Sequence, residues 1–507
     1  MLPGFTATIQ SVEPVTLVGG LVLGTLFLYL LYQRQSLLLV NGKKPLELGY
    51  GHAQQRYLHH AQSLIKSGLS KCSVFNIVSE SGVKTVLSPK YANELRSHEH
   101  LSFGGAIQRE FHANIAGFEP FQSATTSDEI FQDAIRMKLT QRLGTITKPL
   151  SDEASVALEK NWTDNTDWHT IRLRPSILKI VAQLSSLVFL GHQICRNPDW
   201  LRITVDYTTD SFLAAEDLRL WPMFLRPLIA KFLPSCRKIR AELQEARGII
   251  TPVLERRKVA KKAAIERGEE PEKYNDAMEW MEQCSKGRLY DPVTAQMLFS
   301  IAAIHTTSDL ITQVLCDLCG RDSLVDALRE EILTVIKEEG WKKSTLYKLK
   351  LMDSVLKESQ RLKPTGIATM RRYVEDKVTL SDGIVIPKGA QIIVSNDRMW
   401  DPAVYRNPGE FDPRRFLELR GMPGHETSAQ FVAPSPEHMG FGFGTHACPG
   451  RFFAANEVKV ALCHILLKYD FRLAQGCTPQ VRRKGTSLTA DPLARIEIRR
   501  RKEEMHL

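Results

Sequence analysis

The sequence lacks the features that would divide a chain of 507 residues into many units. It contains no internal repeat and no low-complexity segment, and no Pro-, Gly- or Ser-rich linker interrupts it after the first 50 residues. These absences argue against a repeat architecture and against a largely disordered chain. With 43% hydrophobic and 24% charged residues, the chain can bury a large core. We expect one large, two-lobed body.

A disulfide framework is also lacking. The nine cysteines are scattered and odd in number, which indicates a reducing compartment that faces the cytosol. Cys316-x-x-Cys319 is a single CxxC in an apolar helical stretch, where we expect it to pack. A zinc site needs clustered ligands, and Cys448 is the one cysteine in its loop.

The basic residues are not interleaved with aromatic ones as in a nucleic-acid module. A formal net charge of +10 is therefore not read as a sign of nucleic-acid binding. A basic surface suits an anionic membrane or an acidic electron-transfer partner.

Near the start, residues 15–32 form an uncharged run of 18, long enough for a transmembrane helix. A cleaved signal peptide is the rival reading, but no Lys or Arg precedes the run and no clear cleavage site follows it. Arg34 and Lys43 come after the run and favour a cytosolic body. We expect an anchor over 1–35 and a cytosolic domain over 36–507.

The remaining pattern is mainly helical. Asp291-Pro292 is a capping carboxylate followed by proline at the first helical position, and apolar residues then continue to Cys319. That predicts a buried helix of about 28 residues and roughly 42 Å. Further helices are expected over 129–143, 151–158, 175–189, 237–259, 324–338 and 345–362, with strands over 73–77, 83–87, 377–380, 384–386 and 390–394. The predicted fold class is mainly α with a small β-rich lobe.

A glycine-studded loop at 441–450 carries one cysteine just before a further helix. Pro449 suits the first helical position, which places Cys448 at the cap, facing unpaired N–H groups and the positive end of the helix dipole. These groups favour a thiolate, which either attacks a substrate or binds a soft metal. A papain-like protease would also need a histidine partner, and none is signalled.

The residues around the cysteine favour a metal-bound flat ligand. Gly444 lets the chain double back, Gly450 removes bulk where a flat ligand could approach, Phe441 can shield the sulfur, and His446 is a polar group two residues before it. This pattern is typical of a haem-binding loop with Cys448 as axial ligand. Here the sequence resembles the cytochromes P450, whose FxxGxxxCxG signature it meets.

The resemblance implies the cytochrome P450 fold and haem b (iron protoporphyrin IX). It implies a monooxygenase that takes electrons from an NADPH-cytochrome P450 reductase to activate dioxygen and hydroxylate, or oxidise in several steps, a lipophilic small molecule. Desaturation or rearrangement on the same cofactor is an alternative, and a non-catalytic haem carrier or sensor is a further one.

Hydroxyls interrupt the long apolar helix at residues 302–308. A mid-helix hydroxyl usually bonds back to the preceding turn. By the resemblance, Thr306 is the proton-relay hydroxyl above the iron, and His305 stands where the family usually has an acid. A histidine could relay protons, pack or contact substrate.

Glu358 and Arg361 are three apart and can pair on one helix face. The same ExxR spacing also occurs at Glu216, so position rather than pattern distinguishes this pair. By the resemblance, Arg415 in Pro-Arg-Arg-Phe completes a network that fixes the coil behind the haem. We expect its role to be structural.

The resemblance also implies basic residues at the haem propionates. Arg371 is the expected partner, with Arg372 as an equally charged neighbour, and His446 could reach a propionate. The family's Trp-x-x-x-Arg in an early helix is absent, and Lys138 or Arg142 could replace its charge.

Three short stretches, at 41–45, 138–141 and 303–308, are similar to fungal ent-kaurene oxidase and its relatives. The resemblance implies a polycyclic terpenoid or meroterpenoid substrate in fungal secondary metabolism, and a single-pass protein of the endoplasmic reticulum with its catalytic domain in the cytosol. The expected substrate walls are 103–121, 211–225, 302–306, 366–369 and 487–489.

Overall fold

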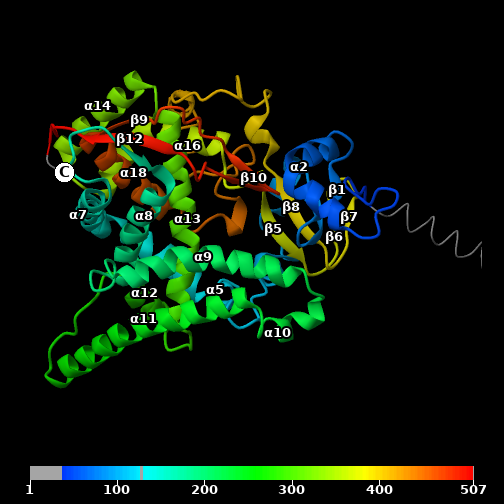
Figure 1. The fold of residues 1–507 in the computed structure, drawn as a ribbon, viewed down its shortest axis with the longest axis horizontal. Helices are drawn as coiled ribbons and strands as arrows, with labels where there is room; N and C mark the ends of the chain where they lie inside the picture. Colours follow the sequence, from blue (N-terminus) through cyan, green and yellow to red (C-terminus); the bar gives the residue numbers. More distant parts are fainter. Residues whose placement is uncertain (1–36, 126–128, 506–507) are drawn as a thin grey trace, which may run out of the picture.

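The computed structural model describes residues 37–125 and 129–505. Most of these residues form helices, and a smaller lobe built on a five-stranded sheet lies at one side (Figure 1). The predicted class, mainly α with a small β-rich lobe, is confirmed. The predicted anchor helix at 15–32 lies outside the described residues.

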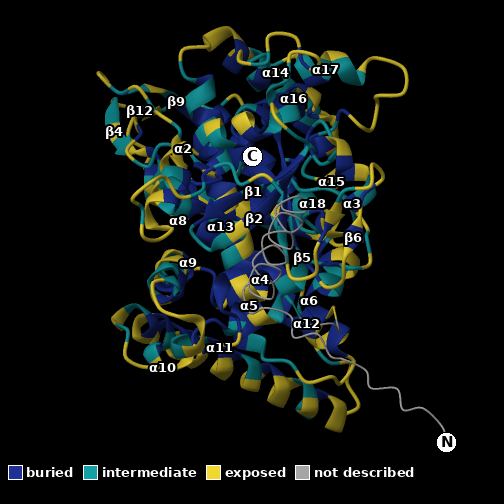
Figure 2. Ribbon diagram, turned by 90° about the vertical axis from the view of Figure 1, so that its right-hand side faces the viewer, coloured by how far each residue is buried: buried dark blue, intermediate teal, exposed yellow. Residues whose placement is uncertain are grey.

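The longest apolar helix, α13 (Pro292–Leu318), runs through the middle of the helical lobe (Figure 1). The prediction for this helix is confirmed to within one residue, including the cap: the Asp291 carboxylate accepts a hydrogen bond from the Val293 N–H at 2.9 Å. It packs against α8 (Leu173–Leu190), α9 (Pro198–Arg219) and α18 (Arg451–Lys468). Figure 2 shows α13 and α18 largely in the colour of buried residues.

Within the described residues, two helices are long and apolar enough to cross a membrane, α8 and α13. Their most apolar windows are 72% and 61% buried inside the protein. Because a core helix of a large domain has the same length and composition, we assign both to the core.

The small lobe holds a sheet with strand order β1-β2-β8-β5-β3. Strands β2 and β8 run parallel, with Thr85 opposite Ile392, and the other neighbours are antiparallel. A β-bulge in β5 between Thr369 and Arg372 includes Met370 at φ +51°. A bulge of this kind changes the direction in which the following side chains point. The strands are β1 (Val74–Ser79), β2 (Gly82–Leu87), β3 (Leu101–Ser102), β5 (Ala368–Val374) and β8 (Gln391–Ser395).

Three smaller sheets complete the strands: β4 (His169–Arg172) with β12 (Arg495–Arg500) and β9 (Tyr469–Leu473), β10 (Arg482–Lys484) with β11 (Ser487–Thr489), and β6 (Val378–Thr379) with β7 (Val385–Ile386). The helices are α2 (Gly51–Leu69), α3 (Ala92–Leu95), α4 (Phe103–Phe111), α5 (Glu119–Ser123), α6 (Ile130–Asp133), α7 (Leu143–Trp162), α10 (Arg226–Ile229), α11 (Pro234–Glu266), α12 (Ala277–Ser285), α14 (Asp322–Glu339), α15 (Lys343–Lys348), α16 (Lys350–Leu362) and α17 (Arg415–Arg420).

Two sequence predictions differ from the structure. The helix expected over 345–362 is two helices, α15 and α16, because Leu349 adopts a ψ of 75° between them. The helix expected over 129–143 is α6 followed by a π-helical segment, Ala134–Leu139, and a turn before α7. Single π-helical turns are often found at functional sites.

Candidate active site

The loop at 441–450 doubles back on itself before α18. The Cys448 N–H donates to the Phe441 carbonyl at 2.7 Å, which closes the loop. Gly444 has φ +80°, and a Cβ there would lie 2.2 Å from the Arg96 carbonyl oxygen, so no larger residue fits. At Gly450, by contrast, an added Cβ would meet nothing among the described residues within 4 Å. The loop is therefore tight on the side of Arg96 and open beside the cysteine.

The start of α18 corrects one prediction. The helix begins at Arg451 with Gly450 as its cap, so Pro449 is not the first helical residue. The N–H groups of Gly450 and Arg451 still point at the Cys448 sulfur and lower the pKa of its thiol, but burial is the larger influence and leaves the pKa raised. Backbone donors alone therefore do not hold a thiolate here, and a bound metal cation would supply the missing positive charge.

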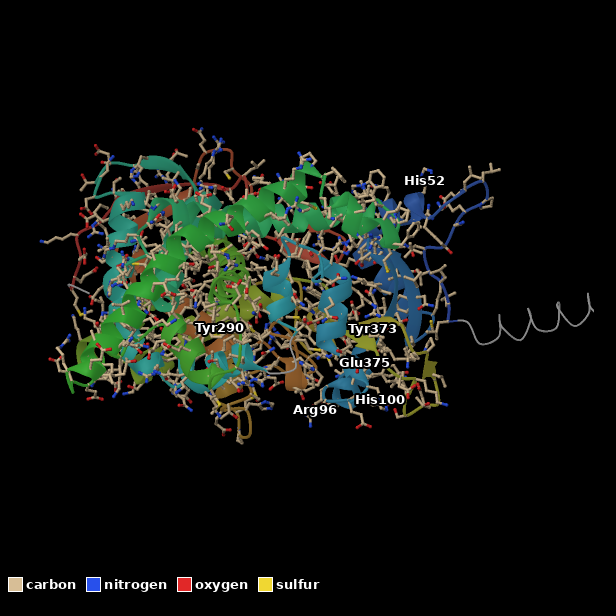
Figure 3. The ribbon with its side chains drawn as sticks, turned by 90° about the horizontal axis from the view of Figure 1, so that it is seen from below. His52, Arg96, His100, Tyr290, Tyr373 and Glu375 are labelled. Atoms are coloured by element: carbon tan, nitrogen blue, oxygen red, sulfur yellow. The ribbon has the colours of Figure 1, made fainter. Side chains whose placement is uncertain are left out.

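A cavity of about 600 Å³ lies beside this loop, between α4 and β5. Its lining includes Arg96, Phe103, Arg372 and His446. Figure 3 labels Arg96, Tyr373 and Glu375 in the same part of the molecule, and all three line this cavity. The His446 ring stacks on Phe103 with centroids 5.6 Å apart, and burial with the charge of Arg372 lowers the pKa of His446 to about 4.

The structure separates the two neighbouring arginines of β5. Arg371 pairs with Glu110 of α4 at 3.6 Å, so its charge is already compensated. Arg372 is 3% exposed, donates to the Arg371 carbonyl at 2.7 Å, and leaves its Nη2 without a hydrogen-bond partner among the described residues. Burial lowers the pKa of Arg372 to about 10. An unpaired guanidinium beside a cavity suits an anionic ligand group, so the geometry favours Arg372 over the predicted Arg371.

A second cation near the loop was missed in the sequence. Arg136, in the π-helical segment, donates to the Thr445 carbonyl at 3.4 Å, and its charge contributes to the lowered pKa of His446. Arg142 points instead to Asn275, at 3.4 Å. Lys138 lies near Cys284, where burial raises the pKa of the thiol and the charge of Lys138 partly opposes that rise. The sequence did contain one signal for Arg136. This arginine lies four positions after Gln132, and Gln132 stands where the family's Trp-x-x-x-Arg motif has its tryptophan.

One face of α13 is open in the middle of this otherwise buried helix. Ala302 and Thr306, four residues apart, are exposed, whereas Ile304 and Thr307 beside them are buried. The Thr306 hydroxyl donates to the carbonyls of Ala302 and Ala303, at 2.9 and 3.2 Å. Because this bond is local to the helix, the hydroxyl remains accessible from the open face.

His305 points in a different direction. Its Nε2 lies 3.0 Å from the Val205 carbonyl of α9, and burial lowers the pKa of the ring. The ring is therefore neutral, and Nε2 carries the proton that is donated to the carbonyl. This contact ties α13 to α9.

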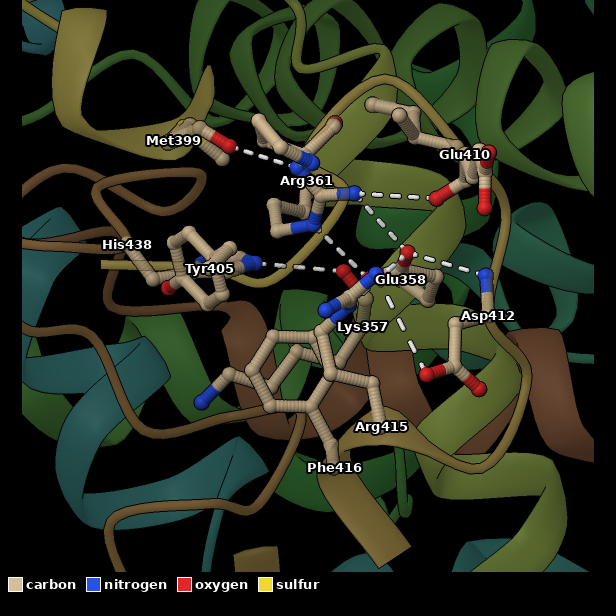
Figure 4. Close-up of polar contacts among 12 residues, drawn as sticks. Lys357, Glu358, Arg361, Met399, Tyr405, Glu410, Asp412, Arg415, Phe416 and His438 are labelled. Atoms are coloured by element: carbon tan, nitrogen blue, oxygen red, sulfur yellow. Dashed lines mark hydrogen bonds and ion pairs between the residues drawn. The ribbon is translucent and has the colours of Figure 1, made fainter. Parts of the chain in front are cut away.

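The structure brings together the predicted charge network (Figure 4). Arg361 donates to both oxygens of Glu358 at 2.8 Å, and Arg415 Nε reaches the same oxygens at 3.1 Å. The side chains of Glu358 and Arg361 are fully buried. Arg361 also donates to the carbonyls of Met399 and Pro408, at 2.6 and 2.8 Å. The network thus fixes the coil that leads to the cysteine loop.

Lys357 and His438 extend this network and were not foreseen. The buried Lys357 ammonium donates to the carbonyls of Ser428, Gln430 and Ala433 at 2.7–3.0 Å, and burial lowers its pKa to about 7. The His438 ring lies 3.1 Å from the Lys357 carbonyl, and burial lowers its pKa to about 3. A lysine on an amphipathic helix normally indicates a solvated face, so no local pattern indicates this buried role.

The residues present fit a haem. A cysteine sulfur beside an open glycine, an exposed strip on α13, and a buried arginine at a cavity with one nitrogen lacking a partner among the described residues match the needs of an axial ligand, a distal face and a propionate. Together with the mainly helical fold, these features define a haem–thiolate protein.

The chain belongs to the cytochrome P450 family: the family's sequence model matches residues 60–497. Similar proteins are cytochrome P450 monooxygenases of fungi. The chain is 57% identical to adrA of Penicillium rubens, with 97% of each chain covered, and 48% identical to esdpI of Penicillium shearii, with 92% of each covered. It is 44% identical to ptmU of Penicillium ochrochloron over 96% of this chain and 97% of that protein. The predicted family and enzyme class, a cytochrome P450 monooxygenase, are confirmed.

Proposed function

We propose that this monooxygenase is membrane-anchored, holds haem b through Cys448, takes electrons from an NADPH-cytochrome P450 reductase, and hydroxylates or oxidises in several steps a lipophilic polycyclic substrate of the terpenoid or meroterpenoid class in fungal secondary metabolism. The observation that carries the proposal is the open face of α13. Ala302 and Thr306 are the exposed positions of a helix that is otherwise core.

When bound, the haem supplies the redox chemistry that activates dioxygen. Around it, the N–H groups of Gly450 and Arg451 point at the Cys448 sulfur, and Arg372 and Arg136 offer positive charge at the cavity. The His446 and Phe103 rings stack beside them.

On the open face, Thr306 holds a hydroxyl that is fixed at one rotamer by the Ala302 carbonyl and can pass a proton toward the substrate side. His305 does not complete this relay, because its Nε2 is occupied by the Val205 carbonyl of α9. We therefore assign Thr306 the proton-relay role and His305 a positioning role, with bulk water as the proton source.

An apolar substrate is supported by the aromatic residues around α4 and α5. The Phe111 and Phe121 rings stack at 4.5 Å, and Phe212 of α9 meets Phe111 edge-on at 5.1 Å. These rings lie within two of the ranges expected to form substrate walls, 103–121 and 211–225. An aromatic cluster there would bind an apolar polycyclic molecule through contact area rather than through charge.

The membrane assignment is supported by an apolar surface over the end of α9, α10 and the start of α11. Leu220 and Phe224 are 83% and 81% exposed there. Basic residues flank them, as expected for a surface that meets lipid headgroups. Its other exposed members are Phe212, Leu213, Trp221, Met223, Leu228 and Phe232.

The test is turnover of the full chain in membranes with a reductase, NADPH and a panel of polycyclic terpenoids under labelled dioxygen. One labelled oxygen atom in the product is expected for hydroxylation. A product that has lost two hydrogens and carries no label would favour the alternative, a desaturase or rearrangement enzyme. Oxygen derived from water would refute the proposal.

A further inference from the structure

A buried ion pair one turn beyond Thr306 connects α13 to two other segments. Asp309 pairs with Lys363, whose side chain is 3% exposed against 7% for Asp309. The other oxygen of the same carboxylate accepts the Ala490 N–H at 2.7 Å. Burial lowers the pKa of Lys363, and the charge of Asp309 opposes that effect. One carboxylate thus joins the core helix, the end of α16 and the turn after β11.

The two tethered segments are bonded to each other. We call residues 364–369 the wall segment and residues 486–490 the turn segment. The Ile367 N–H donates to the Thr486 carbonyl at 2.8 Å, and the Leu488 N–H donates to the Thr365 carbonyl at 3.1 Å. A bridge pairs Gly366 with Ser487. The two segments therefore form one hydrogen-bonded unit. Asp309 joins this unit to α13, and Asn396, just after β8, holds its other side by donating to the carbonyls of Ile367 and Gly366 at 2.9 and 2.7 Å.

This unit reaches from the core helix to the cysteine loop. At its far end, the Thr369 hydroxyl lies 3.8 Å from where a Cβ on Gly442 would stand. Thr365 and Ser487 are exposed, although the residues next to them, Pro364 and Leu488, are buried. Because Asp309 lies three residues after Thr306 on the same helix, its carboxylate holds the unit about one helical turn from the open face.

We propose that Asp309, held by Lys363, is a positioning residue that sets where the wall and turn segments stand relative to Thr306, and so determines how a bulky ligand lies above the haem. This rests on the proposed function of the site. A pair that only stabilised the fold would need neither a bond to the turn segment nor a place one turn from the reacting face. Buried ion pairs contribute little net stability but can fix one arrangement of the elements they join.

The chain offers a matched control. Arg257 and Asp276 form a second buried ion pair, at 2.7 Å with side chains 7% and 3% exposed, and the Asp276 carboxylate also accepts a backbone N–H, from Glu279 at 3.1 Å. That pair joins α11 to α12 rather than to the wall and turn segments.

The experiment uses the full chain, loaded with haem, and two probes that bind iron: imidazole, which is small, and clotrimazole, which carries three phenyl rings beside its imidazole. Two double variants replace the pair without leaving a lone charge, Asp309→Leu/Lys363→Met and Asp309→Asn/Lys363→Met. The control is Asp276→Leu/Arg257→Met. Affinities are read from the Soret shift, and backbone amide exchange is measured over the turn segment.

We expect Asp309→Leu/Lys363→Met to bind clotrimazole about tenfold more weakly, the equivalent of one lost hydrogen bond, with imidazole affinity changed less than about twofold. Amide exchange over residues 486–490 should rise about tenfold. Asp309→Asn/Lys363→Met retains an oxygen for the Ala490 N–H and should recover most of both losses. The control pair should leave the ratio of the two affinities unchanged.

The proposal would be overturned if Asp309→Leu/Lys363→Met weakened the binding of both azoles equally, which leaves the ratio of the two affinities unchanged. It would also be overturned if the control variant changed that ratio by the same amount. If Asp309→Leu/Lys363→Met does not take up haem, Lys363→Met alone decides. Amide exchange should then rise over residues 365–367 while Ala490 stays protected. Unchanged protection over residues 365–367 would contradict the positioning role of the Asp309–Lys363 pair. A wild-type chain that gives no Soret shift with imidazole would instead refute the proposed haem site, so the two failures are distinct.

Discussion

Replacing Glu358 by glutamine tests the buried charge network most sharply. The amide keeps the shape and one acceptor oxygen but removes the charge that compensates Arg361 and Arg415. Both guanidinium groups then remain in the interior, Arg361 without any exposed surface. Breaking a buried pair in this way costs about 3–5 kcal/mol. That is a large share of the 5–15 kcal/mol by which a typical domain is stable.

The chain contains its own control, because Glu216 begins a second ExxR pattern on α9. Glu216 pairs with Lys484 at 2.7 Å, but the two side chains are 41% and 59% exposed. Glu216→Gln should therefore cost no more than about 1 kcal/mol. We expect Glu358→Gln to lose most of its bound haem and to melt well below Glu216→Gln, measured as haem per protein and as the thermal midpoint. Equal haem content and equal midpoints in the two variants would refute a structural role for the network.

Three further predictions follow from single groups. Arg372→Met should release haem to an acceptor globin several-fold faster than wild type, whereas Arg371→Met should keep its haem and weaken mainly the contact with α4. Faster haem release from Arg371→Met than from Arg372→Met would instead support Arg371 as the propionate partner. The folded pKa of His438, about 3, lies below the unfolded value near 6.5, so the unfolded chain binds more protons between these values and stability falls as pH falls below about 6.5. This ring should lower the free energy of unfolding by about 1.4 kcal/mol per pH unit in that range. In His438→Gln that contribution should vanish, so the urea midpoint should depend less steeply on pH. An unchanged pH dependence of the urea midpoint would contradict the prediction. Thr306→Ala should raise the amount of hydrogen peroxide released per NADPH, with little change in the melting temperature. Thr312 is buried and its hydroxyl also bonds within α13, so Thr312→Ala should instead lower the melting temperature with little change in peroxide release.

Much of this architecture is predictable from local sequence. The length and start of α13 follow from a capping aspartate, a proline and an uninterrupted apolar run, and the sheet strands near Gly383 and Gly389 follow from turn residues between short β-branched segments. The Glu358 network was predicted from spacing plus chain position, because the same spacing at Glu216 leads to a surface pair.

Other features depend on contacts between distant segments. The choice between Arg371 and Arg372 is made by a bulge in β5 and by Glu110, about 260 residues earlier in the chain. The direction of the His305 ring depends on α9. The start of α18 at Arg451 could not be fixed from Pro449, because proline is equally common in the turn before a helix.

The thiolate bond of Cys448 is the central claim, and it can be measured directly. The reduced, CO-bound difference spectrum of the wild-type chain should show the long-wavelength Soret band of a thiolate-ligated haem. Cys448→Ser should lose that band and its monooxygenase activity, while Cys463→Ser, at a fully buried cysteine within α18, should keep both. A Cys448→Ser variant with the wild-type band, or a wild-type chain without it, would contradict the account.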